Sequence, residues 1–485
     1  MILKSKYISA LKHTKNVFDL LSVMMEKLVG NVGNQVQFIT NSEGLFKKSK
    51  QYREFVDAVK IIFQSFDDGV YKYKVDRLFE TILQLPLFEG FSAEDQNNVV
   101  LYGVLKGINI AAAVYKIEDH DDLGPLDTDN KHLYRIYARP KETLLDSFEK
   151  NARRRANSIS LPYVFDRFVF FDSQNWKKEH GKSGIPRGVI TSETICNTSH
   201  ATEKYLRVGI CAFSSERNFK FVDIENRRSI KYYDSSYQKK NATRVRNSLI
   251  AAMEKECDLF VLPEYSAHQD IINAVQQTLV EAKDMGLTPP ILTFVGSTWT
   301  KDGNNVMTIF NNDGDIFYRD EKPLKYYKAC PYRDDNITED LKNPGKQCPF
   351  FYIPKIGLIL PSICRDVFDT NYTRILASQF LPLLVINSAY TESVEYFLSK
   401  PEVLASEYFT SSVVSNYCSA RKKDNIGKCV IVKNADKSYP QHESKLITRC
   451  AQCQEKCAIG CLFITDFRFF SAHNDTELTN PSPSL

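Results

Sequence analysis

The sequence predicts an α/β protein in which a mostly helical N-terminal domain precedes a domain of alternating strands and helices. Two observations carry this prediction. Up to about residue 115 the apolar residues recur at helical spacing. Beyond about residue 200, short apolar runs alternate with helical segments, and strands interleaved with helices are typical of a sheet that is covered by helices.

Composition sets limits on the class of protein. The chain has 485 residues, long enough for several domains, and 43% of them are hydrophobic and 25% charged, as in ordinary packed proteins. The formal net charge is only +4, so no global field attracts nucleic acid or anionic lipid, and we expect neither as a partner. The first residues contain no secretory signal, so we expect a cytoplasmic protein whose twelve cysteines are reduced thiols.

The N-terminal half contains clear helical stripes and one buried helix. The first stripe consists of Val17, Leu20, Leu21, Met24 and Leu28. Residues 99–115 are apolar but too short and too polar for a membrane span, and Ser92 upstream is a suitable N-cap, so we expect a buried helix there. A Gly-, Ser- and Thr-rich stretch at residues 181–202 indicates a linker. We therefore expect domains at residues 1–200 and 203–472 and a flexible tail at 473–485.

The second half alternates between strand-like and helix-like segments. We expect strands at residues 206–213, 259–262, 291–296, 356–363, 383–386 and 462–467, and a hairpin around 311–314. We expect helices at residues 245–253, 271–282 and 372–379. In such sheets chemistry takes place where strands end.

Three reactive side chains follow these predicted strands. Glu264 follows the short apolar run at 259–262, Lys322 follows the hairpin, and Cys364 lies between a strand and a helix. A helix N-terminus lowers the pKa of a cysteine thiol. A nearby carboxylate can accept the thiol proton, and an ammonium group can stabilise the charge that develops on an attacked carbonyl or nitrile.

These residues carry a resemblance to a known family. The motifs are Leu262-Pro263-Glu264, Gly296 with Asn304 and Asn305, Asp313-Gly314 with Lys322, and Ile363-Cys364-Arg365-Asp366. Their order resembles that of the nitrilase (carbon–nitrogen hydrolase) superfamily over about residues 203–470. The resemblance implies an α-β-β-α sandwich, a Glu264–Lys322–Cys364 triad, a cysteine thioester intermediate and a homo-oligomer. It also implies a small amide or nitrile substrate and no cofactor for catalysis.

Two details depart from the family pattern. Only Pro323 separates Lys322 from Leu324, where the family usually has two residues, so Lys325 is an alternative to Lys322. Many members also have a second glutamate soon after the lysine. Here Asp334, Asp335 and Glu339 are the candidates, and none is a clear match.

A second cysteine group lies near the end of the chain. It consists of Cys450, Cys453, Cys457 and Cys461. Four cysteines within twelve residues of a reduced protein suggest structural zinc, because thiolates bind zinc tetrahedrally. The spacing is not that of two C-x2-C knuckles, so unliganded thiols and an iron–sulfur cluster stay open.

A non-enzymatic function is the alternative hypothesis. The nitrilase-like domain could be a binding or regulatory platform whose helical N-terminal domain recognises an unknown protein partner. Related nitrilase-like domains occur attached to bacterial reverse transcriptases in antiviral defence. No polymerase motif in this sequence supports such a partnership. A reverse transcriptase is therefore one specific partner within the platform hypothesis.

Overall fold

The computed structural model divides into two compact units, Met1–Trp176 and Lys177–Leu485. It describes most of residues 11–112, short segments within 134–138, 168–176 and 186–190, most of residues 205–417, and the segments 429–434, 442–447 and 461–468. Strand β3 (Arg187–Ile190) lies inside the expected linker, yet it pairs in parallel with β14 (Pro349–Ile353) of the second unit. This part of the expected linker is therefore a strand.

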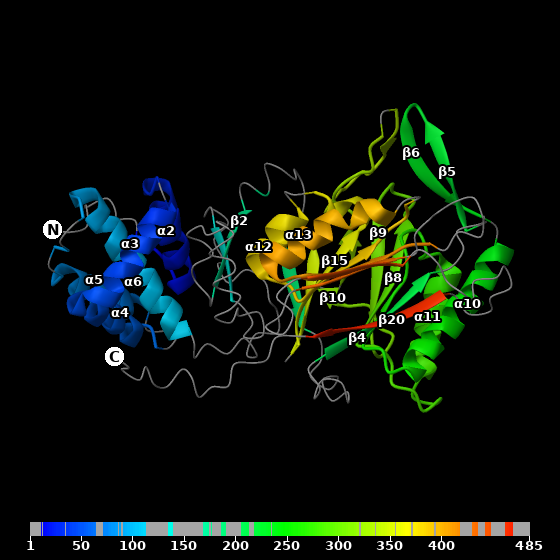
Figure 1. Ribbon diagram of the computed structural model, residues 1–485, viewed down its shortest axis with the longest axis horizontal. Helices are drawn as coiled ribbons and strands as arrows, with labels where there is room; N and C mark the ends of the chain where they lie inside the picture. Colours follow the sequence, from blue (N-terminus) through cyan, green and yellow to red (C-terminus); the bar gives the residue numbers. More distant parts are fainter. Residues whose placement is uncertain are drawn as a thin grey trace. The chain divides into compact units, whose positions relative to one another are not determined.

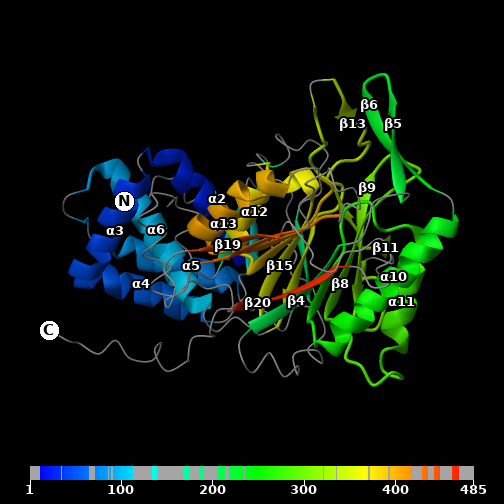
Figure 2. The same cartoon turned by 45° about the vertical axis from the view of Figure 1, so that its right-hand side comes forward.

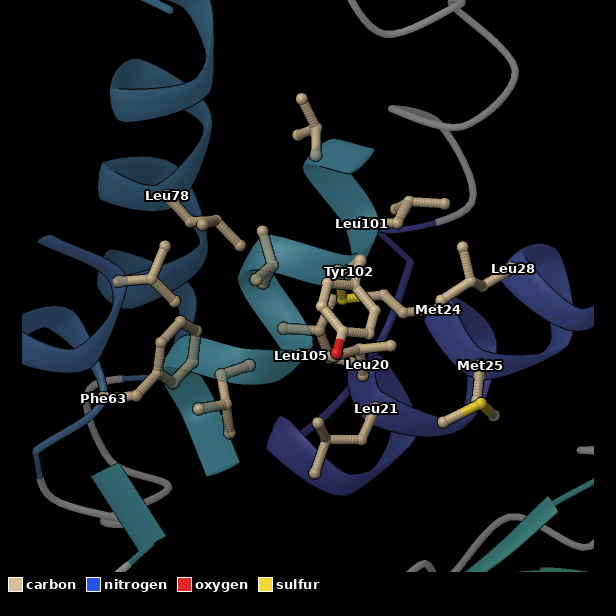
Figure 3. Packing of buried hydrophobic residues seen from close by; sticks show 14 of the residues in the cluster. Leu20, Leu21, Met24, Met25, Leu28, Phe63, Leu78, Leu101, Tyr102 and Leu105 are labelled. Carbon is tan, nitrogen blue, oxygen red and sulfur yellow. The ribbon is translucent and has the colours of Figure 1, made fainter. Parts of the chain in front are cut away.

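The first unit is helical, as predicted. Its helices are α2 (Val17–Asn31), α3 (Gln35–Lys48), α4 (Lys50–Ile62), α5 (Tyr71–Leu83) and α6 (Ala93–Ala111). The stripe predicted on α2 is buried, and Figure 3 shows Leu20 and Met24 of this stripe beside Leu101, Tyr102 and Leu105 of α6. A small antiparallel pair, β1 (Tyr134–Ala138) and β2 (Phe168–Asp172), completes the described part of this unit.

Helix α6 is the buried helix that the sequence predicts, and Ser92 is its N-cap, accepting a hydrogen bond from the N–H of Asp95. Two of its glycines permit close contact with α4. A Cβ atom at Gly107 would lie 2.7 Å from the Val59 side chain. Within the part of the chain that the structure describes, none of the helices has both the length and the apolar content needed to cross a membrane.

The second unit contains two large mixed sheets. The first has the strand order β12-β9-β8-β7-β4-β20, in which β4, β7 and β8 are parallel neighbours and β20 closes the edge antiparallel to β4. Its strands are β4 (Tyr205–Ala212), β7 (Leu259–Val261), β8 (Leu292–Trp299), β9 (Asn305–Asn311), β12 (Tyr326–Tyr327) and β20 (Cys461–Arg468). The predicted strands near 206, 259, 291 and 462 are all confirmed.

The second sheet has the order β19-β18-β17-β16-β15-β14-β3, with parallel pairs β15–β16 and β16–β17 at its centre. Its further strands are β15 (Gly357–Ile363), β16 (Leu384–Ser388), β17 (Ser411–Ser415), β18 (Cys429–Lys433) and β19 (Glu443–Ile447). Strands β14 to β17 have every residue buried, which is typical of strands covered on both faces.

The two sheets pack face to face between layers of helices. Phe294 of β8 contacts Phe351 of β14, and the Ser388 hydroxyl of β16 donates to the Leu262 carbonyl beyond β7. Helices α10 (Ser235–Glu254) and α11 (Gln269–Glu281) cover the first sheet, and α12 (Thr373–Phe380) and α13 (Ser399–Tyr408) cover the second, as Figure 1 shows. The second unit is therefore an α-β-β-α sandwich, and the predicted fold class is confirmed.

A small third sheet projects from the sandwich. It has the order β13-β6-β5 and consists of β5 (Phe219–Ile224), β6 (Arg227–Tyr232) and the short β13 (Thr338–Glu339). Figure 2 shows the β5–β6 hairpin extending away from the large sheets with β13 beside it. None of these three strands was predicted from the sequence.

Candidate active site

Glu264 lies just beyond strand β7, in the loop that leads to α11. Its side chain is only 1% exposed. The carboxylate oxygen Oε2 accepts the backbone N–H of Tyr390 at 3.0 Å, and Oε1 accepts Nδ2 of Asn305 at 2.8 Å. The end of a short parallel strand therefore holds a carboxylate inside the sandwich, as the sequence predicts.

A glycine in the neighbouring strand leaves room for the Glu264 loop. Strand β8 has an irregular register between Phe294 and Ser297, and Gly296 there adopts φ +74°. A Cβ atom at Gly296 would lie 1.9 Å from the Pro263 carbonyl oxygen and 2.2 Å from the Ser266 hydroxyl. The segment around Glu264 therefore packs so closely against residue 296 that only glycine fits there.

We predict that Gly296→Ala lowers the free energy of unfolding by about 3 kcal/mol, because it adds both backbone strain and a steric clash. Gly286→Ala is the matched control: Gly286 also has a positive φ, +69°, but a Cβ there meets nothing within 4 Å. It should cost only about 1 kcal/mol. Urea unfolding of both variants measures the difference, and equal losses would contradict the proposed role of the close approach.

Cys364 lies directly after strand β15, at a sharp turn. Its backbone has φ +47°, which is uncommon for a residue with a Cβ, and strained backbone of this kind clusters at functional sites. The Asn387 side chain donates to the Cys364 carbonyl oxygen at 3.0 Å, and Sγ lies 3.9 Å from the Tyr390 carbonyl oxygen. The segment that begins at Cys364 is a four-residue 3₁₀ turn, Cys364–Val367, and the predicted helix at residues 372–379 is present further on as α12.

The lysine of the cluster is Lys328, which follows strand β12. Its side chain is 1% exposed, and Nζ lies 2.8 Å from Oε1 of Glu264 and 2.7 Å from Oε2 of Glu339. The backbone N–H of Lys328 donates to the Asn305 carbonyl oxygen at 2.9 Å, which fixes the residue to the start of β9. One ammonium group therefore bridges two buried carboxylates.

Lys322 does not lie in this cluster. It is exposed in strand β11 (Lys322–Pro323), which forms a separate two-stranded hairpin with β10 (Tyr318–Arg319). The alternative, Lys325, is only partly buried and precedes β12. The prediction that Lys322 lies beside Glu264 and Cys364 is therefore wrong, and Lys328 occupies that position. Its signal in the sequence is Tyr326-Tyr327, a strand-forming pair directly before the lysine.

Glu339 is the second carboxylate, which the sequence left open among three acidic residues. Its side chain accepts four hydrogen bonds or ion-pair contacts. Besides Lys328, the donors are the Tyr265 hydroxyl at 3.0 Å, Nδ2 of Asn305 at 3.2 Å and the Tyr332 N–H at 2.9 Å. Asn305 thus donates to both glutamates and holds them on either side of the lysine.

Burial and mutual charge set the protonation of the cluster. Burial raises the pKa of Cys364, and the Glu264 charge raises it further, so the resting group is a thiol in contact with the Glu264 carboxylate. Burial also raises the pKa of Glu264, against the opposing effect of Lys328. Burial lowers the pKa of Lys328, but Glu264 and Glu339 more than offset this, and the pKa lies well above its usual value. The expectation that a helix N-terminus lowers the pKa of the Cys364 thiol is therefore wrong.

Asp366 joins the Cys364 turn to the segment that carries Lys328. Its Oδ1 accepts the backbone N–H groups of Ala329 and Cys330 at 3.0 and 2.7 Å. Its Oδ2 accepts the Tyr326 hydroxyl at 3.0 Å and the Ile363 N–H at 3.3 Å. The Asp366 side chain is fully buried. Its carboxylate therefore connects the segment around Lys328 to Ile363, the residue before Cys364.

The suggested zinc ligands fall outside the described residues. This applies to Cys450, Cys453 and Cys457, and to the side chain of Cys461 at the start of β20. Among the described residues, no group of three or more His, Cys, Asp or Glu side chains converges as a metal site.

No family model and no curated protein matches the chain. Among solved structures, the chain is similar to a glutamine-dependent NAD+ synthetase from Acinetobacter baumannii, with 14% identity, 58% of this chain covered and a TM-score of 0.37. The match covers 49% of the synthetase, so it spans about half of that protein's length.

Two further solved structures are covered almost completely. An amidase of the nitrilase superfamily from Nesterenkonia AN1 has 14% identity, 56% of this chain and 95% of its own covered, and a TM-score of 0.37. A CN-hydrolase superfamily protein from Xanthomonas campestris has 13% identity, 56% and 92% covered, and a TM-score of 0.35. Both are named as members of the superfamily that the sequence resembles.

Proposed function

We propose that the chain is a carbon–nitrogen hydrolase of amidase type that works through a cysteine thioester. The observation that carries this proposal is the buried cluster of Cys364, Glu264, Lys328 and Glu339 at the strand ends of the sandwich. It combines a nucleophile, a carboxylate in contact with that nucleophile, and a fixed positive charge. The scheme needs no metal or organic cofactor.

The first half-reaction forms the thioester. Glu264 takes the thiol proton as the Cys364 sulfur attacks the carbonyl carbon of the substrate, and a carbon–sulfur bond forms. The Lys328 ammonium group and the backbone N–H of Arg365, the residue after the nucleophile, stabilise the oxyanion. The carbon–nitrogen bond then breaks, Glu264 returns its proton to the leaving nitrogen, and ammonia or an amine departs.

The second half-reaction releases the acid. Glu264 removes a proton from water, and the resulting hydroxide attacks the thioester carbon. The carbon–sulfur bond breaks, the carboxylic acid leaves, and the Cys364 sulfur regains its proton from Glu264. Glu339 contacts Lys328 but no reacting atom, and in this scheme it is a positioning residue that keeps the lysine charged and fixed.

We predict that wild-type protein incubated with a small amide carries an acyl group on Cys364, which intact-protein mass spectrometry detects after an acid quench. Fluoroacetamide, acetamide and butyramide are suitable probes because they test small and slightly larger acyl groups. Cys364→Ala should lose both the adduct and all turnover, and Cys257→Ala, which removes a buried thiol outside the cluster, should retain both. Unchanged turnover in Cys364→Ala would rule out the scheme.

The second candidate is the non-enzymatic platform, and the low accessibility of the thiol favours it. Cys364 is 6% exposed, and its raised pKa keeps it protonated at rest. A platform predicts that Cys364 reacts with iodoacetamide no faster than the other buried thiols and that no amide forms an adduct. A stoichiometric partner recovered with wild-type and Cys364→Ala protein alike would support the platform.

A further inference from the structure

A cavity of ≈ 810 Å³ in the second unit lies beside the catalytic cluster. Its wall includes Glu339, which pairs with Lys328, as well as Ala329, which follows Lys328, and Arg365, which follows Cys364. The turn of the β5–β6 hairpin and the β13 segment form another part of the wall, in the projecting sheet seen in Figure 2. The cavity therefore meets the cluster at Glu339 and Arg365, and the described residues that line it include neither Cys364 nor Glu264.

The wall of this cavity is suited to a polar ligand. Among the described residues that form it, none is aromatic, Leu341 is the only branched aliphatic one, and most of the others are charged or polar. Sites for aromatic or long aliphatic ligands are lined predominantly by hydrophobic and aromatic side chains. The non-reacting part of the substrate should therefore be polar.

Two arginines in the wall are available to a ligand. Nη1 of Arg365 donates to the Arg333 carbonyl oxygen at 2.9 Å, which tethers the Arg365 side chain to the loop that carries the second arginine. Among the described residues, neither guanidinium has a carboxylate partner. The third arginine of the wall, Arg227, differs because it pairs with Asp340 at 3.1 Å.

The acidic groups of the wall are engaged or solvated. Glu339 pairs with Lys328, and Asp340 pairs with Lys342 at 2.8 Å as well as with Arg227. Asp369 accepts the Tyr372 N–H and the Cys330 thiol. Glu225 is exposed in the β5–β6 turn, where water and salt screen its charge. The free positive charge nearest in sequence to the nucleophile is therefore that of Arg365.

We propose that the substrate is a small polar amide whose non-reacting end carries a carboxylate, bound by Arg365 and Arg333; this inference rests on the proposed function. A guanidinium presents donors in a planar fork that matches both oxygens of a carboxylate. The reacting amide would then lie over Cys364 with the carboxylate at the arginine side of the cavity.

The test compares two amides that differ in this one group. Succinamate carries the carboxylate, and 4-methylpentanamide replaces it with a neutral isopropyl group. Wild-type protein should have a kcat/KM at least about 10-fold higher for succinamate, and Arg365→Gln should lower that preference by about 10- to 100-fold. Arg333→Gln should lower it in the same direction. Arg246→Gln, which removes an arginine of α10 paired with Glu281, should leave the preference unchanged.

The ratio of kcat/KM for succinamate to kcat/KM for 4-methylpentanamide tests this inference separately from the proposed function. Cys364-dependent turnover with no preference for succinamate would overturn the substrate class and leave the hydrolase intact. If neither amide is turned over, calorimetry of both with Cys364→Ala decides. The substrate class is supported if Cys364→Ala binds succinamate and the double variant Arg365→Gln/Cys364→Ala binds it at least about 10-fold more weakly. The substrate class is overturned if succinamate does not bind or if the neutral amide binds equally well.

Discussion

Lys328→Met should lower kcat/KM for an amide substrate by about 10³-fold, whereas Lys322→Met should leave it unchanged. Lys328 is the ammonium group that contacts Glu264 and Glu339 at 2.8 and 2.7 Å, and loss of one stabilising donor at a developing oxyanion costs this much. Lys322 is exposed and lies in a separate hairpin. Steady-state kinetics of the two variants measure the contrast.

The same substitution should also destabilise the protein. Removing Lys328 leaves two buried carboxylates without their cation, and the loss in unfolding free energy should be about 3–5 kcal/mol. Lys322→Met should change it by less than about 0.5 kcal/mol. Urea unfolding monitored by circular dichroism gives both values.

A double variant distinguishes the structural role of Lys328 from its catalytic role. Glu339→Gln in the Lys328→Met background removes one of the uncompensated charges, so it should restore part of the stability. It should restore none of the activity, because the oxyanion still lacks its cation. Recovery of activity together with stability would show that Lys328 acts only as a structural residue. A loss of kcat/KM in Lys322→Met equal to that in Lys328→Met would reject Lys328 as the catalytic lysine.

The alternation of strands and helices and two of the site residues were predictable because they depend on local pattern, whereas the α-β-β-α sandwich was implied by the resemblance to the nitrilase superfamily. The run 259–262 is apolar and short, so a strand that ends before Glu264 follows from the sequence. The same reasoning places Cys364 after the apolar run 356–363. In both cases the strand end fixes the side chain at the sheet edge where parallel strands finish.

The lysine was not predictable because the segment between β9 and β14 has little regular structure. Its strands are two residues long, so neither periodicity nor spacing determines which lysine enters the sandwich. That choice depends on contacts that are distant in the sequence, namely the Asn305 carbonyl oxygen and the Asp366 carboxylate. Glu339 is fixed in the same way, by Tyr265 and Asn305.

Asp366→Asn should lower kcat by about 10- to 100-fold with a much smaller change in KM, because Asp366 holds both Lys328 and Cys364 in place without touching the substrate. An amide at this position keeps one acceptor for Ala329 and Cys330 but turns a donor toward the Ile363 N–H. The unmatched donor costs about 1–3 kcal/mol at the turn that carries the nucleophile. Tyr326→Phe removes one donor to the same carboxylate and should have a smaller effect.

The pH dependence of stability gives a readout that is specific to the carboxylate. Burial raises the pKa of Asp366 from 3.8 to about 7, against the opposing effects of the Cys330 N–H and of Lys328. Because the folded value is higher than the unfolded one, the stabilising contribution of protonated Asp366 is complete below pH 3.8. This contribution to the free energy of unfolding, roughly 4 kcal/mol, is lost as the pH rises to about 7.

Wild-type protein should therefore lose stability relative to Asp366→Asn as the pH rises from 4 to 7, and the difference should be constant above about pH 8. The neighbouring groups do not produce this slope: burial raises the pKa of Cys348 to about 12 and that of Tyr326 well above its usual value. Glu264 and Lys328 are present in both proteins, so any contribution from them that the substitution leaves unchanged cancels in the difference. Parallel pH profiles of unfolding for the two proteins, together with an unchanged kcat in Asp366→Asn, would show that this carboxylate neither titrates in the folded state nor positions the catalytic residues.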